Sequence, residues 1–157
     1  MKEGNIMQRL IRYCQGLFGG KMNQTEIGRT DIVYHNAIRD RVKQHHELKT
    51  ALSRLIILRN RADARMSSLE EDLSIVEGAL KKAAKAGDEE RGLELLDKRN
   101  TLQTALETSK IESHGFTEQI DSAKEGLQKL ATSITELKAE QAKMEARRKH
   151  AQARIQA

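Results

Sequence analysis

The feature that most constrains the fold is a seam of apolar residues that recurs every three or four positions through most of the chain. Alternate steps of four and three residues from Leu48 to Leu80 meet nine apolar side chains in ten positions. The same stepping from Leu95 to Ile155 meets thirteen in eighteen. A register of this kind is typical of α-helices that pack in coiled coils, and a disordered chain does not keep it. The sequence therefore predicts two long helices.

A helix stop and a helix start separate the two seams, in the stretch KAGDEERGLELL at residues 85–96. Gly87 suits the left-handed conformation that follows a helix C-terminus, and three lysines precede it. Asp88 can cap the next helix, whose first turn carries Glu89 and Glu90. So short a connection favours antiparallel neighbours. We therefore predict an all-α fold, an elongated antiparallel coiled-coil hairpin that turns at these four residues.

One alternative is a continuous helix in an intermolecular coiled coil, because one glycine costs a helix only about 1 kcal/mol. A hairpin would instead pair residues whose numbers sum to about 174, twice the number of the tip residue Gly87. The large apolar residues expected in the coiled-coil core are Leu48, Leu52, Leu55, Met66, Leu69, Leu73, Leu80, Phe116, Ile120, Leu127, Leu130, Ile134 and Leu137.

The composition fits a rod of helices better than a layered globular core. The 157 residues include no Pro, no Trp, two Phe, two Tyr and 32% charged residues. The single Cys14 cannot form an intramolecular disulfide, and no run of 18 apolar residues could cross a bilayer. We therefore expect a cytoplasmic protein.

Residues 6–18, IMQRLIRYCQGLF, form a separate amphipathic segment, followed by Gly19 and Gly20. The expected organisation is an amphipathic helix with its joint at 1–22, a linker or the start of the first arm at 23–34, and hairpin arms at about 35–86 and 88–157. A helix with one apolar face and basic borders can lie in a membrane interface. The residues expected to contact lipid are Ile6, Met7, Arg9, Leu10, Ile11, Arg12, Leu17, Phe18 and Lys21. Equally, this face could be buried against the hairpin or another subunit.

Charge is distributed in three blocks. Residues 1–66 have a formal net charge of +7, residues 67–137 of −6 and residues 138–157 of +4. A fold at Gly87 would place the acidic block at the tip and both basic blocks at the open end. Such an end would be attracted to anionic lipid, and acidic tips could meet basic ends of neighbouring copies. Charge blocks on long helices are also often only solvated faces.

No pattern typical of catalysis is found in the sequence. The five histidines lack the spacing of a zinc site, and there is no phosphate-binding loop, nucleotide fingerprint or nucleophile with a paired base. We therefore expect no enzymatic activity, no catalytic residue, no metal and no cofactor. Nucleic-acid binding is disfavoured because stacking aromatic residues do not accompany the basic residues.

A basic, apolar N-terminal helix followed by a long hairpin that turns at AGDEERGLELLDKRNTL resembles phage shock protein A and the vesicle-inducing protein of plastids, bacterial members of the ESCRT-III superfamily. The turn fits the family pattern at its glycine, at Glu89 and Glu90, and at Leu96 with the three charged residues that follow. It departs from that pattern at Arg91, Gly92 and Leu93.

The resemblance implies a peripheral protein on the inner face of the cytoplasmic membrane that self-assembles, binds anionic lipid and protects or remodels the membrane under envelope stress. In the phage shock branch it also implies a hairpin that holds an AAA+ transcriptional activator inactive. The alternative function is therefore a coiled-coil adaptor that inhibits a protein partner. The further helices of family members have no counterpart before the final Ala157, so the expected assembly partner is either a further copy of this chain or a longer paralogue.

Overall fold

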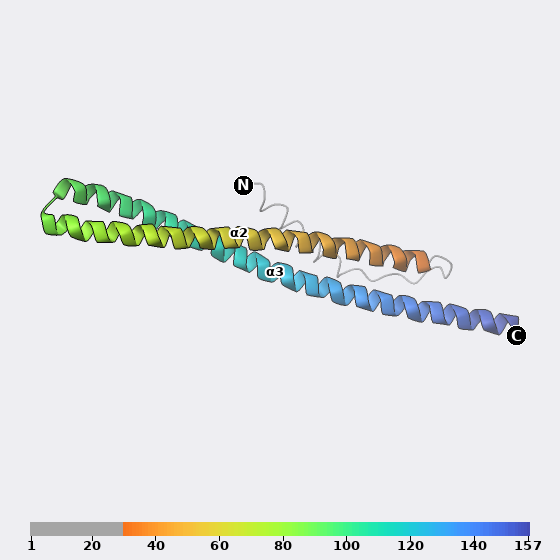
Figure 1. The fold of residues 1–157 in the computed structure, drawn as a ribbon. Helices are drawn as coiled ribbons and strands as arrows, with labels where there is room; N and C mark the ends of the chain where they lie inside the picture. The colour runs from red at the N-terminus through yellow and green to blue at the C-terminus, as the bar shows by residue number, and fades with distance from the viewer. Residues whose placement is uncertain (1–29) are drawn as a thin grey trace. The chain divides into compact units, whose positions relative to one another are not determined.

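The structure is a computed structural model, and it describes residues 30–157. Two α-helices make up this part of the chain: α2 (Thr30–Ala86) and α3 (Glu89–Gln156), joined by a tight turn (Figure 1). The helices pack against each other as an antiparallel hairpin, so the prediction of an all-α helical hairpin is confirmed. The predicted N-terminal amphipathic helix lies outside the described residues.

The described chain divides into two units. Among the described residues, unit 1 contains residues 30–52 of α2 and residues 122–157, which include the C-terminal part of α3, and unit 2 is Ser53–Asp121 with the turn at its end. Each unit is therefore built from a segment of α2 beside a segment of α3.

Only Gly87 and Asp88 lie between the end of α2 and the start of α3. Gly87 has φ +68°, and its backbone N–H donates to the carbonyl of Ala84 while the N–H of Asp88 donates to that of Ala83. These two bonds form a Schellman motif, which satisfies carbonyls that the end of a helix leaves unpaired. The Asp88 carboxylate in turn accepts the N–H of Arg91 at 3.2 Å, an N-cap bond to the first turn of α3.

Replacing Gly87 by Ala should destabilise the hairpin by about 1–2 kcal/mol, because a Cβ in the left-handed region is strained even though nothing lies within 4 Å of it. Gly78→Ala is the matched control. It lies inside α2, its added Cβ also meets nothing, and it should stabilise the protein by up to about 1 kcal/mol. Urea unfolding followed by circular dichroism measures both changes, and equal effects of the two substitutions would contradict the role of Gly87.

Unit 1 is held together by a leucine cluster between the helices. Leu48 of α2 and Ala123 and Leu130 of α3 are each at most 4% exposed, with Leu52 and Leu127 packed against them. A Cβ built on Gly126 would lie only 3.1 Å from Leu48 Cδ2, so the helices approach closely at this level. Tyr34 donates a hydrogen bond to Glu140 at 3.4 Å. Both pairs have residue numbers that sum to 174, the predicted register.

Unit 2 has a core of smaller and more polar residues. Its buried side chains are Leu55, Ala62, Val76, Ala83, Ser109 and Ile120. At the middle of the unit Ser113 donates to Asp63 at 2.6 Å, and Arg65 forms an ion pair with Glu112 at 3.4 Å. These pairs join residues of one chain within the unit, as a hairpin requires. The continuous intermolecular helix considered from the sequence has no such pairs.

Candidate functional site

The residues predicted to contact lipid all lie outside the part of the chain that the structure describes. They are Ile6, Met7, Arg9, Leu10, Ile11, Arg12, Leu17, Phe18 and Lys21. The interaction surfaces described below therefore belong to the hairpin alone.

The residues predicted for the coiled-coil core are each buried or half-buried in the structure. Leu48, Leu55, Ile120, Leu130 and Leu137 are buried. The half-buried members of the set are Leu52, Met66, Leu69, Leu73, Leu80, Phe116, Leu127 and Ile134. At the predicted turn, Gly87, Asp88, Glu89 and Glu90 are all exposed. The first two residues form the cap described above, and Glu89 and Glu90 lie in the first turn of α3.

A stripe of basic side chains follows one face of α3 near its C-terminus. Lys143, Arg147, His150 and Arg154 recur at steps of four, three and four residues, which places them on one side of a helix. All four are exposed. Arg147, His150 and Arg154, together with two alanines, line a shallow groove. We call these four residues the basic stripe.

Neighbouring basic residues of unit 1 are already engaged. Arg148 forms an ion pair with Asp31 of α2, and Lys149 lies 3.3 Å from Glu145 in the preceding turn of α3. Within residues 30–157 the members of the basic stripe have no such partner. The positive charges of Lys143, Arg147 and Arg154 are therefore not paired with any residue that the structure describes.

Unit 2 carries a stripe of the opposite sign on α3, beginning one residue into the helix. Glu90, Glu94 and Asp97 recur at steps of four and three residues, so they too share one face. All three are exposed, and none has an ion pair with any residue that the structure describes. Leu93, beside this face, leaves 68% of its surface exposed. We call these three residues the acidic stripe.

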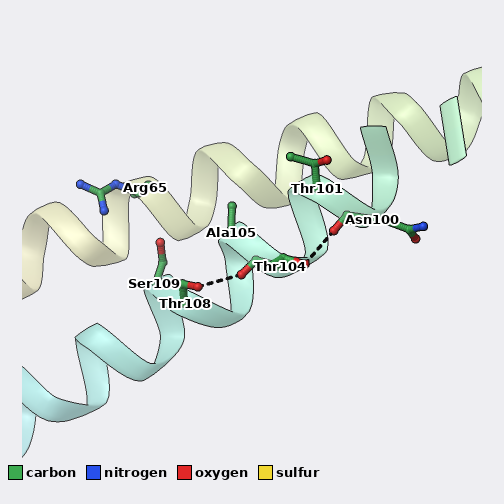
Figure 2. Close-up of a pocket in the computed structure, with 7 residues that line it drawn as sticks. All are labelled: Arg65, Asn100, Thr101, Thr104, Ala105, Thr108 and Ser109. Atoms are coloured by element: carbon green, nitrogen blue, oxygen red, sulfur yellow. Dashed lines mark hydrogen bonds between the residues drawn. The ribbon is translucent and has the colours of Figure 1, made fainter. Parts of the chain in front are cut away.

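An open pocket continues the acidic stripe along α3 (Figure 2). It measures about 560 Å³ and is lined by Arg65, Asn100, Thr101, Thr104, Ala105, Thr108 and Ser109. Threonine hydroxyls in its lining donate hydrogen bonds to backbone carbonyls of the preceding turn. The Thr108 hydroxyl donates to the Thr104 carbonyl at 3.0 Å, and the Thr104 hydroxyl donates to the Asn100 carbonyl at 3.0 Å. The only charged side chain, Arg65, is paired with Glu112. Such a lining offers a shallow surface of small side chains and no group poised for chemistry.

The hydroxyl group of Tyr34 lies in a half-buried place near the Glu140 carboxylate. Partial desolvation raises the pKa of Tyr34 above its ordinary value of 10.0, and the nearby Glu140 carboxylate raises it further. Tyr34 is therefore a neutral hydrogen-bond donor at physiological pH. No three His, Cys, Asp or Glu side chains between residues 30 and 157 are arranged to hold a metal ion.

The described helices include none long and apolar enough to cross a membrane. The fold thus defines a coiled-coil hairpin protein whose exposed features are charged helical faces. Among known protein families, the sequence model of the PspA/IM30 family matches residues 5–156. The chain therefore belongs to this family. It is a family of membrane-associated proteins without enzymatic activity. No curated protein matches the chain.

The three charge blocks were predicted from the sequence, but the acidic stripe and the basic stripe within them were not. The signal was present in the sequence, because steps of four and three residues identify charged faces as well as apolar ones. The sequence does not show the ion pairs between side chains. These pairs engage Arg148 and Lys149, whereas Arg147 and Arg154 have no ion pair with a described residue.

Proposed function

We propose that this chain is a non-enzymatic peripheral membrane protein that self-assembles on the inner face of the cytoplasmic membrane and maintains or remodels that membrane under envelope stress. The observation that carries the proposal is the family match, which extends from residue 5 to residue 156 and so includes the amphipathic segment together with both hairpin helices. The proposed partners are anionic lipid and either further copies of the chain or a longer paralogue.

Two properties of the chain support this function. The segment at residues 6–18 has apolar residues on one face and arginines at its borders, the pattern of a helix that lies in a lipid interface. One such helix has modest affinity, because it offers only Tyr13 and Phe18 as aromatic anchors. A self-assembling scaffold raises the total affinity by presenting many anchors together.

The proposal predicts that binding to anionic vesicles depends on the apolar face of residues 6–18. Leu10→Glu with Leu17→Glu should abolish flotation with vesicles of phosphatidylglycerol and phosphatidylethanolamine, because charged side chains cannot be buried among acyl chains. A chain lacking residues 1–22 should behave in the same way. Flotation of the purified protein through a density gradient measures the bound fraction.

Gln8→Glu with Gln15→Glu is the matched control, since it adds the same charge to the polar face. This control should keep most of the flotation of the unaltered chain. Equal loss in both double variants would mean that net charge alone governs binding and would contradict an inserted apolar face. If the unaltered chain does not float with anionic vesicles, the membrane function is wrong.

A second candidate function is an adaptor that binds and inhibits a protein such as an AAA+ transcriptional activator. Apolar side chains on the outside of unit 2 favour it: Ile57, Ile75, Leu93 and Ile111 are each at least 51% exposed. Burial of such apolar surface against a protein partner favours association. An adaptor would give small oligomers that do not float and a stoichiometric complex with the purified activator.

A further inference from the structure

The acidic and basic stripes of α3 have matching spacing. Glu90, Glu94 and Asp97 follow one another at steps of four and three residues, and Lys143, Arg147 and His150 do the same. On two α-helices laid side by side, such sets place charges at equal intervals along each axis. Every acidic group of one stripe can therefore stand opposite a basic group of the other.

We propose that the acidic stripe of one copy of the chain docks against the basic stripe of a second copy. These two stripes would be the surfaces through which the chain self-assembles. The inference therefore rests on the self-assembly that is part of the proposed function. Because the two stripes are at different places on the same helix, each copy would offer one surface of each sign. Repetition of this head-to-tail contact adds copies without closing the assembly at a dimer.

Both stripes are open to a partner from outside the chain. Their residues are exposed and have no ion pair among the described residues, whereas Arg148 and Lys149 beside the basic stripe do. Both stripes lie on α3, and one uninterrupted helix cannot pack against itself. The two stripes can therefore meet only between two copies of the chain.

The residues that border the stripes allow two helices to approach. Ala146 and Ala151 flank the basic stripe and line the groove along it. Thr101 and Ala105 line the pocket that continues the acidic stripe, as Figure 2 shows. Leu93 adds an exposed apolar side chain at the edge of the contact. Small side chains at the contact let helix backbones come closer and bring the charged groups of the two stripes within reach.

Anionic lipid is the competing occupant of the basic stripe. Lipid phosphates would account for the exposed arginines, but they would leave the acidic stripe and its spacing without a partner. A second copy accounts for both stripes and for their equal intervals. Exposed ion pairs are individually weak and are screened by salt, so the contact should form at low ionic strength and weaken as salt is added.

Charge reversal tests the contact. One variant combines Glu90→Lys with Glu94→Lys, and the other combines Lys143→Glu with Arg147→Glu. Each alone should weaken self-association about tenfold or more, since attraction becomes repulsion at two positions. An equimolar mixture should recover part of the loss, and the fourfold variant should recover most of it. Sedimentation velocity at low ionic strength measures the association.

Two control variants carry the same charge changes away from the stripes. Glu70→Lys with Glu77→Lys alters exposed residues of α2, and Lys124→Glu with Lys138→Glu alters exposed residues elsewhere on α3; none of the four has an ion pair in the described chain. Both controls should associate like the unaltered chain. Association that falls equally in the controls and the stripe variants would assign the effect to net charge and overturn the proposal.

The remaining outcomes separate this contact from the proposed function. If the stripe variants associate normally, the chain assembles through another surface and only the stripe contact is wrong. If the unaltered chain is a monomer at all concentrations tested, self-assembly and the stripe contact are both wrong. If reversal of the basic stripe abolishes vesicle flotation but not association, the stripe binds lipid and the proposed contact is overturned.

Discussion

Replacing Leu130 by Ala is expected to lower the free energy of unfolding by about 2–4 kcal/mol. Leu130 is 2% exposed and belongs with Leu48 and Ala123 to the buried cluster of unit 1. Removing three carbons takes apolar contacts from Leu48 and leaves a cavity that two facing helices can close only in part. Urea unfolding followed by circular dichroism measures the loss.

Ile111→Ala is the matched control for this substitution. Ile111 lies on the same helix but is 66% exposed, so shortening it removes little buried surface. The expected change is within about 0.5 kcal/mol of zero. A small effect at Leu130, or an equal effect at Ile111, would show that the cluster does not hold unit 1 together.

The hairpin could be predicted because its local and long-range signals agree. The seam of apolar residues marked the packed side of both helices, and Gly87 followed by Asp88 marked the turn between them. The glycine provides the left-handed φ of the Schellman motif, and the aspartate provides the N-cap bond to Arg91. Each of these features depends on residues that are close in sequence, so the sequence alone contains them.

Polar residues on the seam were harder to interpret. Ser109 occupies a weak position of the periodic pattern, yet it is only 2% exposed because its place in the register puts it between the helices. Arg99, also on the seam, is half-buried, and its Nε has no hydrogen-bond partner in the described chain. Periodicity gives the side of a helix on which a residue lies, but the depth of burial depends on what the other helix places opposite.

The candidate interaction surfaces depend even more on contacts between the helices. From the sequence, the last twenty residues are a block of net positive charge, in which Arg148 falls on the seam and Arg147 does not. In the structure Arg148 is paired with Asp31 across the hairpin, and Arg147 faces outward in the basic stripe. That pair joins residues far apart in the sequence, so only the register of α2 against α3 identifies Asp31 as the partner of Arg148.

The same register predicts opposite effects for one substitution at two glycines of α3. Gly126→Leu should destabilise the protein by about 1–3 kcal/mol, because even a Cβ there would lie 3.1 Å from Leu48 Cδ2 and a full side chain must push the helices apart. Gly115→Leu should stabilise it by up to about 1 kcal/mol, since a Cβ at Gly115 meets nothing within 4 Å and leucine is the better helix former. Thermal unfolding of the two variants measures the difference. Stabilisation by both substitutions would mean that the helices do not approach closely at Gly126, and that the leucine cluster of unit 1 is looser than the structure describes.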